Sequence, residues 1–219
     1  MLEHFYQVQK VNLKHNMLPY MAAGLLCLLL SPFMIGMKNL DQYQTSKVIE
    51  LFLSLFGILF FVPVFMPDVN ETIRDLIASK KEFMGSLLLM RFLTSLCLIL
   101  LILLGYLTVL SQGGCQFSFY QEFYGGLANC LFLGGVGMLF FSLFDNMAVA
   151  YMIPVLYYII CYGGGRKYLG NFYLFSMMNG SFEEKHFIMA AAVGMAALAI
   201  GYRSWPFIQI PISKKQAEE

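Results

Sequence analysis

The side chains that could perform chemistry are few in this chain, and they stand far apart. The three histidines lie at positions 4, 15 and 186, too scattered to predict a metal site, and neither an HExxH nor a GxSxG motif occurs. The five cysteines show no CxxC spacing, and four of them fall in apolar stretches, where cysteine usually packs as a small apolar side chain. These residue types predict no metal site and no catalytic centre.

A glycine-rich stretch, GGGRKY at 163–168, invites comparison with a phosphate-binding loop. It lacks the six-residue frame of G-x-x-x-x-G-K-[ST] and its closing Ser or Thr, and that motif occurs nowhere else in the chain. We therefore predict that any ATP used with this protein binds to another polypeptide.

One acid, Glu50, stands where an apolar run begins. Ionisable residues within membrane spans are costly and are usually functional, whereas those at span ends sit at the lipid interface. We interpret Glu50 as an interfacial residue on the outer surface, and a role with a coupling ion or a substrate is the alternative.

The composition is that of a membrane protein. Of the 219 residues, 59% are hydrophobic and 12% are charged, and the mean hydropathy is +0.68, whereas soluble domains have roughly 25% charged residues. The net charge of +1 gives no large positive field, so no nucleic-acid partner is expected.

Apolar runs with few charges predict six membrane-spanning helices. Crossing roughly 30 Å of hydrocarbon as a helix takes about 20 residues, and a helix is needed because lipid cannot satisfy open backbone groups. We place the spans at about 17–37, 48–67, 86–111, 123–144, 147–164 and 186–203. An even number of spans puts both termini on one side of the membrane.

The basic residues predict which side that is. Nine of the fourteen Lys and Arg residues fall on the side of the termini, and positive residues in short loops are retained in the cytoplasm. Both termini are therefore predicted to be cytoplasmic. Residues 1–16 place Leu2, Phe5, Tyr6 and Leu13 near one helical face, which predicts an amphipathic helix in the inner interface before the first span.

A charged segment interrupts the apolar pattern between the second and third spans. It reads DVNETIRDLIASKKEF at 68–83, with Asp68 or Asn70 as a helix cap and Ile73, Leu76 and Ile77 along one face. We predict a cytoplasmic amphipathic helix over about 70–82. Such a helix either lies on the lipid surface or forms a docking element for a soluble partner.

The chain resembles the ABC-2 type permease subunits of ABC transporters. Three stretches are similar to that family: ETIRDLIASKKEFMGSLLLMRFL at 71–93, GMLFFSLFDNMAVAYMIPVLYYII at 137–160, and YLGNFYLFSMMNGSF at 168–182. The resemblance implies an N-terminal interfacial helix, six spans, a coupling helix between spans 2 and 3, and short re-entrant helices on the outer side before span 6, at about 166–184.

The resemblance also implies partners and a mechanism. The coupling helix would dock on a separate P-loop ABC ATPase, which holds ATP and Mg²⁺, and a second permease copy or a sister permease would complete a homodimer or heterodimer in a bacterial cell membrane. The docking contacts are expected at Glu71, Arg74, Asp75 and Lys80. The permease itself would carry out no covalent chemistry, and ATP-driven alternating access would move the cargo.

Weakly polar residues in the spans are the candidates for a cargo path: Thr94, Ser95, Asn129, Tyr151, Tyr157 and Tyr158. A path of this kind fits an amphipathic peptide, an antibiotic or a lipid-like molecule, and export is the direction that the family resemblance implies. The same residues could instead bond to one another between helices. The alternative function is a non-transporting membrane scaffold or immunity protein. The sequence does not decide the cargo, the direction or the choice between homodimer and heterodimer.

Overall fold

The structure is a computed structural model that describes residues 17–36, 39–69 and 84–205. The predicted interfacial helix at 1–16 and the predicted coupling helix at 70–82 lie outside the described residues. The four predicted docking residues, Glu71, Arg74, Asp75 and Lys80, lie outside them as well.

The described part of the chain is all-helical, without strands. The longer helices are α2 (Leu18–Ile35), α4 (Ser54–Phe61), α6 (Met84–Gln112), α7 (Phe119–Phe144), α8 (Met147–Tyr162) and α10 (Glu184–Ser204). The shorter elements are α3 (Gln42–Val48), the π-helix η2 (Ile49–Leu53), α9 (Arg166–Leu169), and the 3₁₀ helices η3 (Val62–Val69), η4 (Gly170–Phe172) and η5 (Met177–Asn179).

Elements α3, η2, α4 and η3 follow one another without a break and form one long helical unit, Gln42–Asp68. Its helical geometry changes along the way, from α to π at η2, back to α, and then to 3₁₀ at η3. A π turn inside an α-helix is rare and is frequently found at a functional site. Here η2 carries the acid Glu50.

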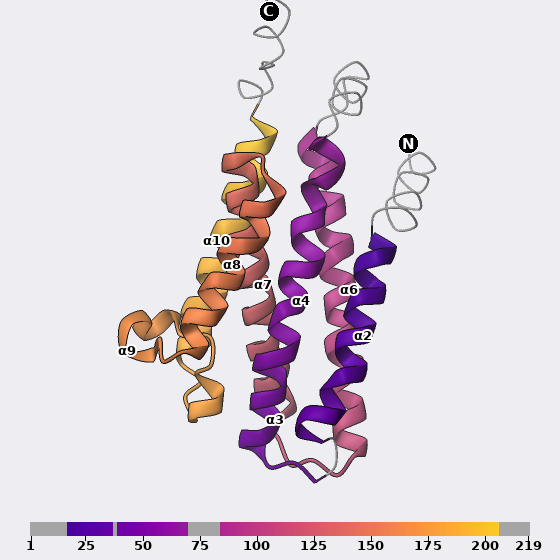
Figure 1. Cartoon of the computed structure of the whole chain (residues 1–219), viewed down its shortest axis with the longest axis vertical. Coiled ribbons are helices and arrows are strands. Elements are labelled where there is room, and N and C mark those ends of the chain that lie inside the picture. Colours follow the sequence, from indigo (N-terminus) through magenta and orange to yellow (C-terminus); the bar gives the residue numbers. More distant parts are fainter. Residues whose placement is uncertain (1–16, 37–38, 70–83, 206–219) are drawn as a thin grey trace, which may run out of the picture.

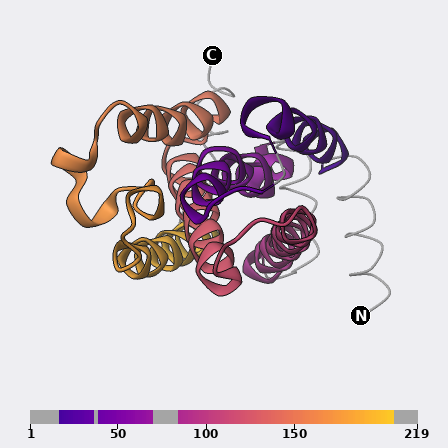
Figure 2. The ribbon, with the colours of Figure 1, turned by 90° about the horizontal axis from the view of Figure 1, so that it is seen from below.

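The helices run side by side along the long axis of the molecule (Figure 1). Helix α7 packs against α4, α6, α8 and α10, while α2 lies against α4 on the side away from α10 (Figure 2). The start of α2, the end of η3, the start of α6 and the end of α10 all lie at the same end of the bundle (Figure 1). We call this the Arg203 end, and the opposite end, where α3 and α10 begin, the Glu50 end.

Four helices of the described residues are long and apolar enough to cross a membrane: Gln42–Asp68, Gly85–Gln112, Phe119–Phe144 and Glu184–Ser204. A fifth results if α8 and the segment Arg166–Phe172 count as one broken span, with a bend of 109° between its two parts. The chain is thus a multi-pass membrane protein by length and composition, as its sequence predicts. In α2, the apolar helix Leu18–Leu30 is shorter than such a span, so six spans stay a prediction.

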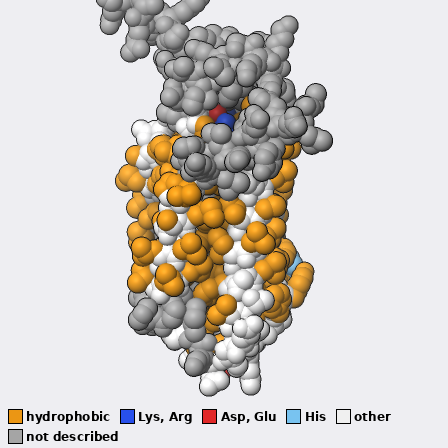
Figure 3. Space-filling view, turned by 90° about the vertical axis from the view of Figure 1, so that its right-hand side faces the viewer, with side chains coloured by type: hydrophobic (Ala, Val, Ile, Leu, Met, Phe, Trp, Pro, Cys, Tyr) orange, Lys and Arg blue, Asp and Glu red, His pale blue; other side chains and the backbone are white. Residues whose placement is uncertain are grey.

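Apolar side chains cover the outside of the bundle as well as its interior. Leu25, Leu26 and Leu29 of α2 are each more than half exposed, and hydrophobic side chains cover the middle of the face seen in Figure 3. A soluble protein rarely exposes so continuous an apolar surface. In lipid, such a surface needs no partner protein.

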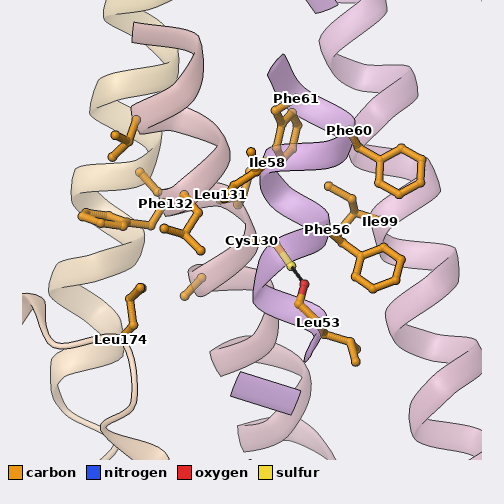
Figure 4. Close-up of a cluster of buried hydrophobic side chains, with 14 of the residues drawn as sticks. Leu53, Phe56, Ile58, Phe60, Phe61, Ile99, Cys130, Leu131, Phe132 and Leu174 are labelled. Atoms are coloured by element: carbon orange, nitrogen blue, oxygen red, sulfur yellow. Dashed lines mark hydrogen bonds between the residues drawn. The ribbon is translucent and has the colours of Figure 1, made fainter. Parts of the chain in front are cut away.

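The core lies between α4 and α7. Helix α4 contributes Phe56, Phe60 and Phe61, and the thiol of Cys130 on α7 donates to the carbonyl of Leu53 at 3.0 Å (Figure 4). The two helices approach closely because Gly57 faces the backbone of Cys130: a Cβ at position 57 would lie 1.9 Å from that carbonyl oxygen. Small residues let membrane helices approach in this way.

In the turn between α7 and α8, one residue ends the first helix and the next residue caps the start of the second. Asp145 ends α7 in the left-handed conformation (φ 48°), and the side chain of Asn146 accepts a hydrogen bond from Ala148 N at 2.8 Å, which caps α8. We expect Asn146→Ala to lower the free energy of unfolding by about 1 kcal/mol, because that amide loses its partner. Thermal denaturation of the purified variant measures the change, and Asn146→Ser, which keeps a capping oxygen, is expected to stay near the wild type.

Candidate functional site

The main polar feature of the described residues is an ion pair buried near the Glu50 end. Lys185 Nζ on α10 lies 2.7 Å from Glu50 Oε1 on η2, and neither side chain is exposed. Charges are almost never fully buried unless they are paired, since leaving water costs several kcal/mol for each ion. The two residues are 135 positions apart in the sequence, so the fold brings them together.

The carboxylate of Glu50 also binds the backbone of the turn that contains η5. Its Oε1 accepts from Met177 N at 3.0 Å, and its Oε2 accepts from Met178 N at 2.9 Å. One side chain therefore fixes two successive amides of the segment between α9 and α10. Glu50 thereby helps to hold this segment against the bundle.

Lys185 has no donor left after its own contacts are counted. An ammonium group has three N–H donors. They are directed to Glu50 Oε1, to Asn129 Oδ1 at 2.9 Å and to the carbonyl of Leu174 at 2.5 Å. A buried cation with all of its donors satisfied is held firmly in one position.

Asn129 connects this pair to α4. Its amide nitrogen donates to Ser54 Oγ at 3.2 Å and to the carbonyl of Leu174 at 3.0 Å, while its oxygen accepts from Lys185. Ser54 in turn donates to the carbonyl of Glu50 at 2.5 Å. We call Glu50, Ser54, Asn129 and Lys185 the polar cluster. It links η2, α4, α7, α10 and the segment that contains Leu174.

Glycine makes room for this arrangement on α7. A Cβ at Gly125 would lie 2.0 Å from Met177 Sδ and 3.6 Å from Lys185 Cε. A larger residue at this position would therefore displace the end of the Met177 side chain. The absence of a side chain at position 125 leaves room for Met177 beside α7.

A second acid, Glu122 in the first turn of α7, is fully buried beside the polar cluster. It shares a hydrogen bond with Ser46 of α3, and it interacts electrostatically with both Glu50 and Lys185. Its second oxygen, Oε2, has no hydrogen-bond partner among the described residues. Two carboxyl groups thus share the surroundings of one lysine.

Other ion pairs lie toward the Arg203 end. Arg91 of α6 donates to Asp68 Oδ1 at 2.8 Å and to the carbonyl of Val64 at 3.4 Å, and both charged side chains are buried. Arg203 pairs with Asp145 at 2.8 Å and lies over the rings of Phe65 and Phe141. The first of these pairs joins η3 to α6, directly beside the segment 70–83.

Two charged residues are more buried than their sequence positions suggest. Glu50, expected at the outer membrane interface, lies buried inside the bundle, where Lys185 and two backbone amides replace its water; its depth in the membrane stays a prediction. Lys185 is one of the five bases counted on the side opposite the termini, the others being Lys38, Lys47, Arg166 and Lys167. It is likewise buried. Without the buried Arg91, eight bases remain on the side of the termini, and without Lys185 four remain on the other side. The excess of bases on the side of the termini persists, so the predicted orientation is unaffected.

Three of the six residues expected to line a cargo path gather around one segment, 172–175. Asn129 and Tyr157 donate to the carbonyls of Leu174 and Phe172, the latter at 2.6 Å, and the ring of Tyr158 contacts Phe175. The hydroxyl of Tyr158 donates to the carbonyl of Leu51 at 2.8 Å. These polar atoms hold elements together.

The other three lie elsewhere. Thr94 and Ser95 bond to carbonyls of their own helix, α6, at 2.8 and 3.1 Å, and Tyr151 lies in the first turns of α8. Helices α4 and α7 lie between α6 and α8 (Figure 2). A cavity of about 440 Å³ near the start of α10 is lined by none of the six; its lining includes Asn171, Ser181, Glu183 and Glu184. The cargo path stays a prediction.

Sequence reasoning missed Glu122 and the partners of Glu50 and Asp68. One signal was present: each of these acids stands next to an apolar run, as in VIELFL around Glu50. An acid in such a position needs a base elsewhere in the bundle. Lys185 and Arg91 border apolar runs in the same way, as do other bases such as Lys38 and Lys47, so this signal does not select the partners.

The described residues contain no group of three or more His, Cys, Asp or Glu side chains that could hold a metal ion. Their polar sites are ion pairs and hydrogen-bond networks between helices. Comparison of the chain with protein family models, with curated proteins and with solved structures found no match.

Proposed function

We propose that the chain is the membrane-embedded permease subunit of an ABC transporter and that it exports an amphipathic peptide, an antibiotic or a lipid-like cargo. A separate P-loop ATPase would bind the segment 70–82 and drive alternating access. Support comes from the resemblance of the sequence to ABC-2 permeases and from the multi-pass helical architecture.

The observation that carries the proposal is the buried pair Asp68–Arg91. A docking element passes force into a membrane domain only when its two ends are joined firmly to the helices. The chain leaves the described bundle at Val69 and returns at Met84. Asp68 stands just before that gap and Arg91 two turns after it, and their ion pair at 2.8 Å joins η3 to α6.

Displacing the segment 70–83 would therefore move η3 and α6 together. Arg91 also donates to the carbonyl of Val64, so its guanidinium spans more than one turn of η3. Breaking a buried pair costs several kcal/mol, which favours movement of the two helices as one body. This is the property expected of a coupling element.

The test is co-purification. The full chain is expressed with a P-loop ATPase encoded beside it, and the complex is purified in detergent through a tag on the chain. We expect the ATPase to co-elute with the wild type and to be lost when residues 70–82 are replaced by a Gly/Ser linker or when Arg74→Glu reverses one charge.

Arg166→Glu is the matched control. Arg166 is an exposed base that follows α8 at the Glu50 end, whereas η3 leads into the segment 70–82 at the Arg203 end. It is expected to retain the ATPase. Normal ATPase binding by the linker variant would contradict docking at 70–82. Failure of every P-loop ATPase to bind the intact chain would favour the alternative, a non-transporting scaffold or immunity protein.

A further inference from the structure

We propose that exposed aromatic side chains form two girdles on this protein, one at each end of the bundle, and that these girdles bind the two headgroup layers of a phospholipid bilayer. The hydrocarbon core of the bilayer then lies between them. The proposal does not depend on the transport function. It rests on where the exposed aromatic residues lie, on the distance between the two ends, and on the positions of the charges.

Within the part of the chain that the structure describes, every exposed aromatic side chain lies at or beyond a helix end. At the Arg203 end, Phe144 is in the last turn of α7, Tyr202 is in the last turn of α10, and Trp205 follows directly. At the Glu50 end, the exposed rings belong to the first turns of α3, α7 and α10, to the last turn of α8, and to α9 and η4. Large exposed side chains in mid-helix, such as Leu101 and Val193, are aliphatic. Two aromatic girdles thus border an aliphatic band.

The exposed rings are suited to a layer that is apolar on one side and hydrated on the other. Tyr and Trp combine an apolar ring with a polar O–H or N–H group, and both are enriched at the headgroup level of membrane proteins. Tyr120 is 69% exposed, Phe144 60% and Trp205 59%. Most of their ring surface is therefore not used for packing within this chain. The edge of a bilayer offers the partner that these rings lack inside the protein.

The distance between the girdles matches the thickness of a bilayer. The starts of α7 and α10 lie together, because Tyr124 Oη is 3.1 Å from His186 Nδ1. At 1.5 Å per residue, α10 rises about 28 Å from His186 to its cap at Trp205, and α7 rises about 36 Å from Tyr120 to Phe144. The hydrocarbon core of a bilayer is roughly 30 Å thick. The two helices bracket that value.

The charged residues keep to the same two levels. Asp145 directly follows Phe144, and Arg203 directly follows Tyr202, so their ion pair lies at the Arg203-end girdle. At the other end, the buried Lys185 lies in the first turn of α10. No exposed Asp, Glu, Lys or Arg among residues 17–36, 39–69 and 84–205 lies within the aliphatic band. Charge at the bilayer centre is costly, so the polar cluster belongs near one headgroup layer.

The single tryptophan of the chain, Trp205, gives a direct test. The full-length protein is reconstituted in phosphatidylcholine vesicles whose acyl chains carry bromine either near the headgroup or near the chain end. Bromine quenches tryptophan fluorescence only at close range. We expect the bromine near the headgroup to quench Trp205 more strongly than the bromine near the chain end, because Trp205 lies in the Arg203-end girdle.

Two variants move this reporter to other levels, each in combination with Trp205→Phe. Tyr120→Trp places it in the Glu50-end girdle, and the order of quenching is expected to be the same as for Trp205. Val193→Trp places it in the aliphatic band, at a position on α10 that is as exposed as Trp205. There we expect the order to reverse. Circular dichroism shows whether each variant keeps its helical fold.

The measurement on the wild type needs no substitution, so it decides the question for the Arg203 end by itself. Stronger quenching of Trp205 by the bromine near the chain end, or no quenching by either lipid, would overturn the girdle at that end. The same two results for a folded Tyr120→Trp variant would overturn the other girdle. An unreversed order in Val193→Trp would show that the hydrocarbon core does not lie between the two.

Discussion

Lys185→Met is expected to lower the free energy of unfolding by about 3–5 kcal/mol. Methionine fills a similar volume, so the loss comes from the charge. Glu50 would keep its two backbone partners, Met177 and Met178, but would stand as an uncompensated buried carboxylate. Denaturant or thermal unfolding of the purified chain in detergent measures the effect.

Two further variants show whether the loss of stability comes from breaking the ion pair or from replacing any lysine. Lys167→Met removes an exposed base on α9 and is expected to change stability by less than about 0.5 kcal/mol. The double variant Glu50→Gln with Lys185→Met should recover part of the loss, because it removes both charges and leaves an amide oxygen for one of the backbone donors. Wild-type stability in Lys185→Met alone would show that the pair does not form.

Gly57→Ala has the second large expected effect. The added Cβ would meet the carbonyl oxygen of Cys130 at 1.9 Å and its carbonyl carbon at 2.6 Å, so α4 and α7 must move apart. Overpacking of this kind costs typically about 1–3 kcal/mol, and contact with rigid backbone places Gly57 at the upper end of that range. The midpoint of thermal unfolding is the measurement.

Gly105→Ala is the matched control in α6. A Cβ at that position meets nothing within 4 Å. Alanine has the better helix propensity, by about 1 kcal/mol, so this variant is expected to be as stable as the wild type or slightly more stable. Equal effects of the two substitutions would contradict the close approach of α4 and α7.

The sequence was sufficient to predict the helical class and the position of most helices. Runs of Leu, Phe and Ile long enough to span lipid are a local property, and α7 at Phe119–Phe144 begins only a few residues before the predicted span at 123–144. The start of that helix was misplaced because an acid, Glu122, seemed to exclude burial. In the folded protein, Ser46 of α3 is a hydrogen-bond partner of Glu122. Only the tertiary structure shows this contact.

Pairing between distant residues was the part that the sequence could not provide. Glu50 has Lys38, Lys47, Arg166, Lys167 and Lys185 on its predicted side of the membrane, and nothing local distinguishes the last from the others. The tertiary structure makes the choice, because it brings Lys185 of α10 to within 2.7 Å of Glu50. Asn129 was selected as a polar residue in a span, but its role as the connector between Lys185 and Ser54 became visible only in three dimensions.

The π turn η2 means that the long helical unit Gln42–Asp68 has two registers, one on each side of residues 49–53. A π turn holds one residue more than an α turn, as if a single residue had been inserted into a regular helix. If the same residues formed a regular α-helix instead, the extra residue would rotate all preceding side chains by about 100° relative to Phe56 and Phe60. The side chains before the turn, including those of α3, would then face other neighbours, so the packing of this end of the bundle depends on the wider π turn.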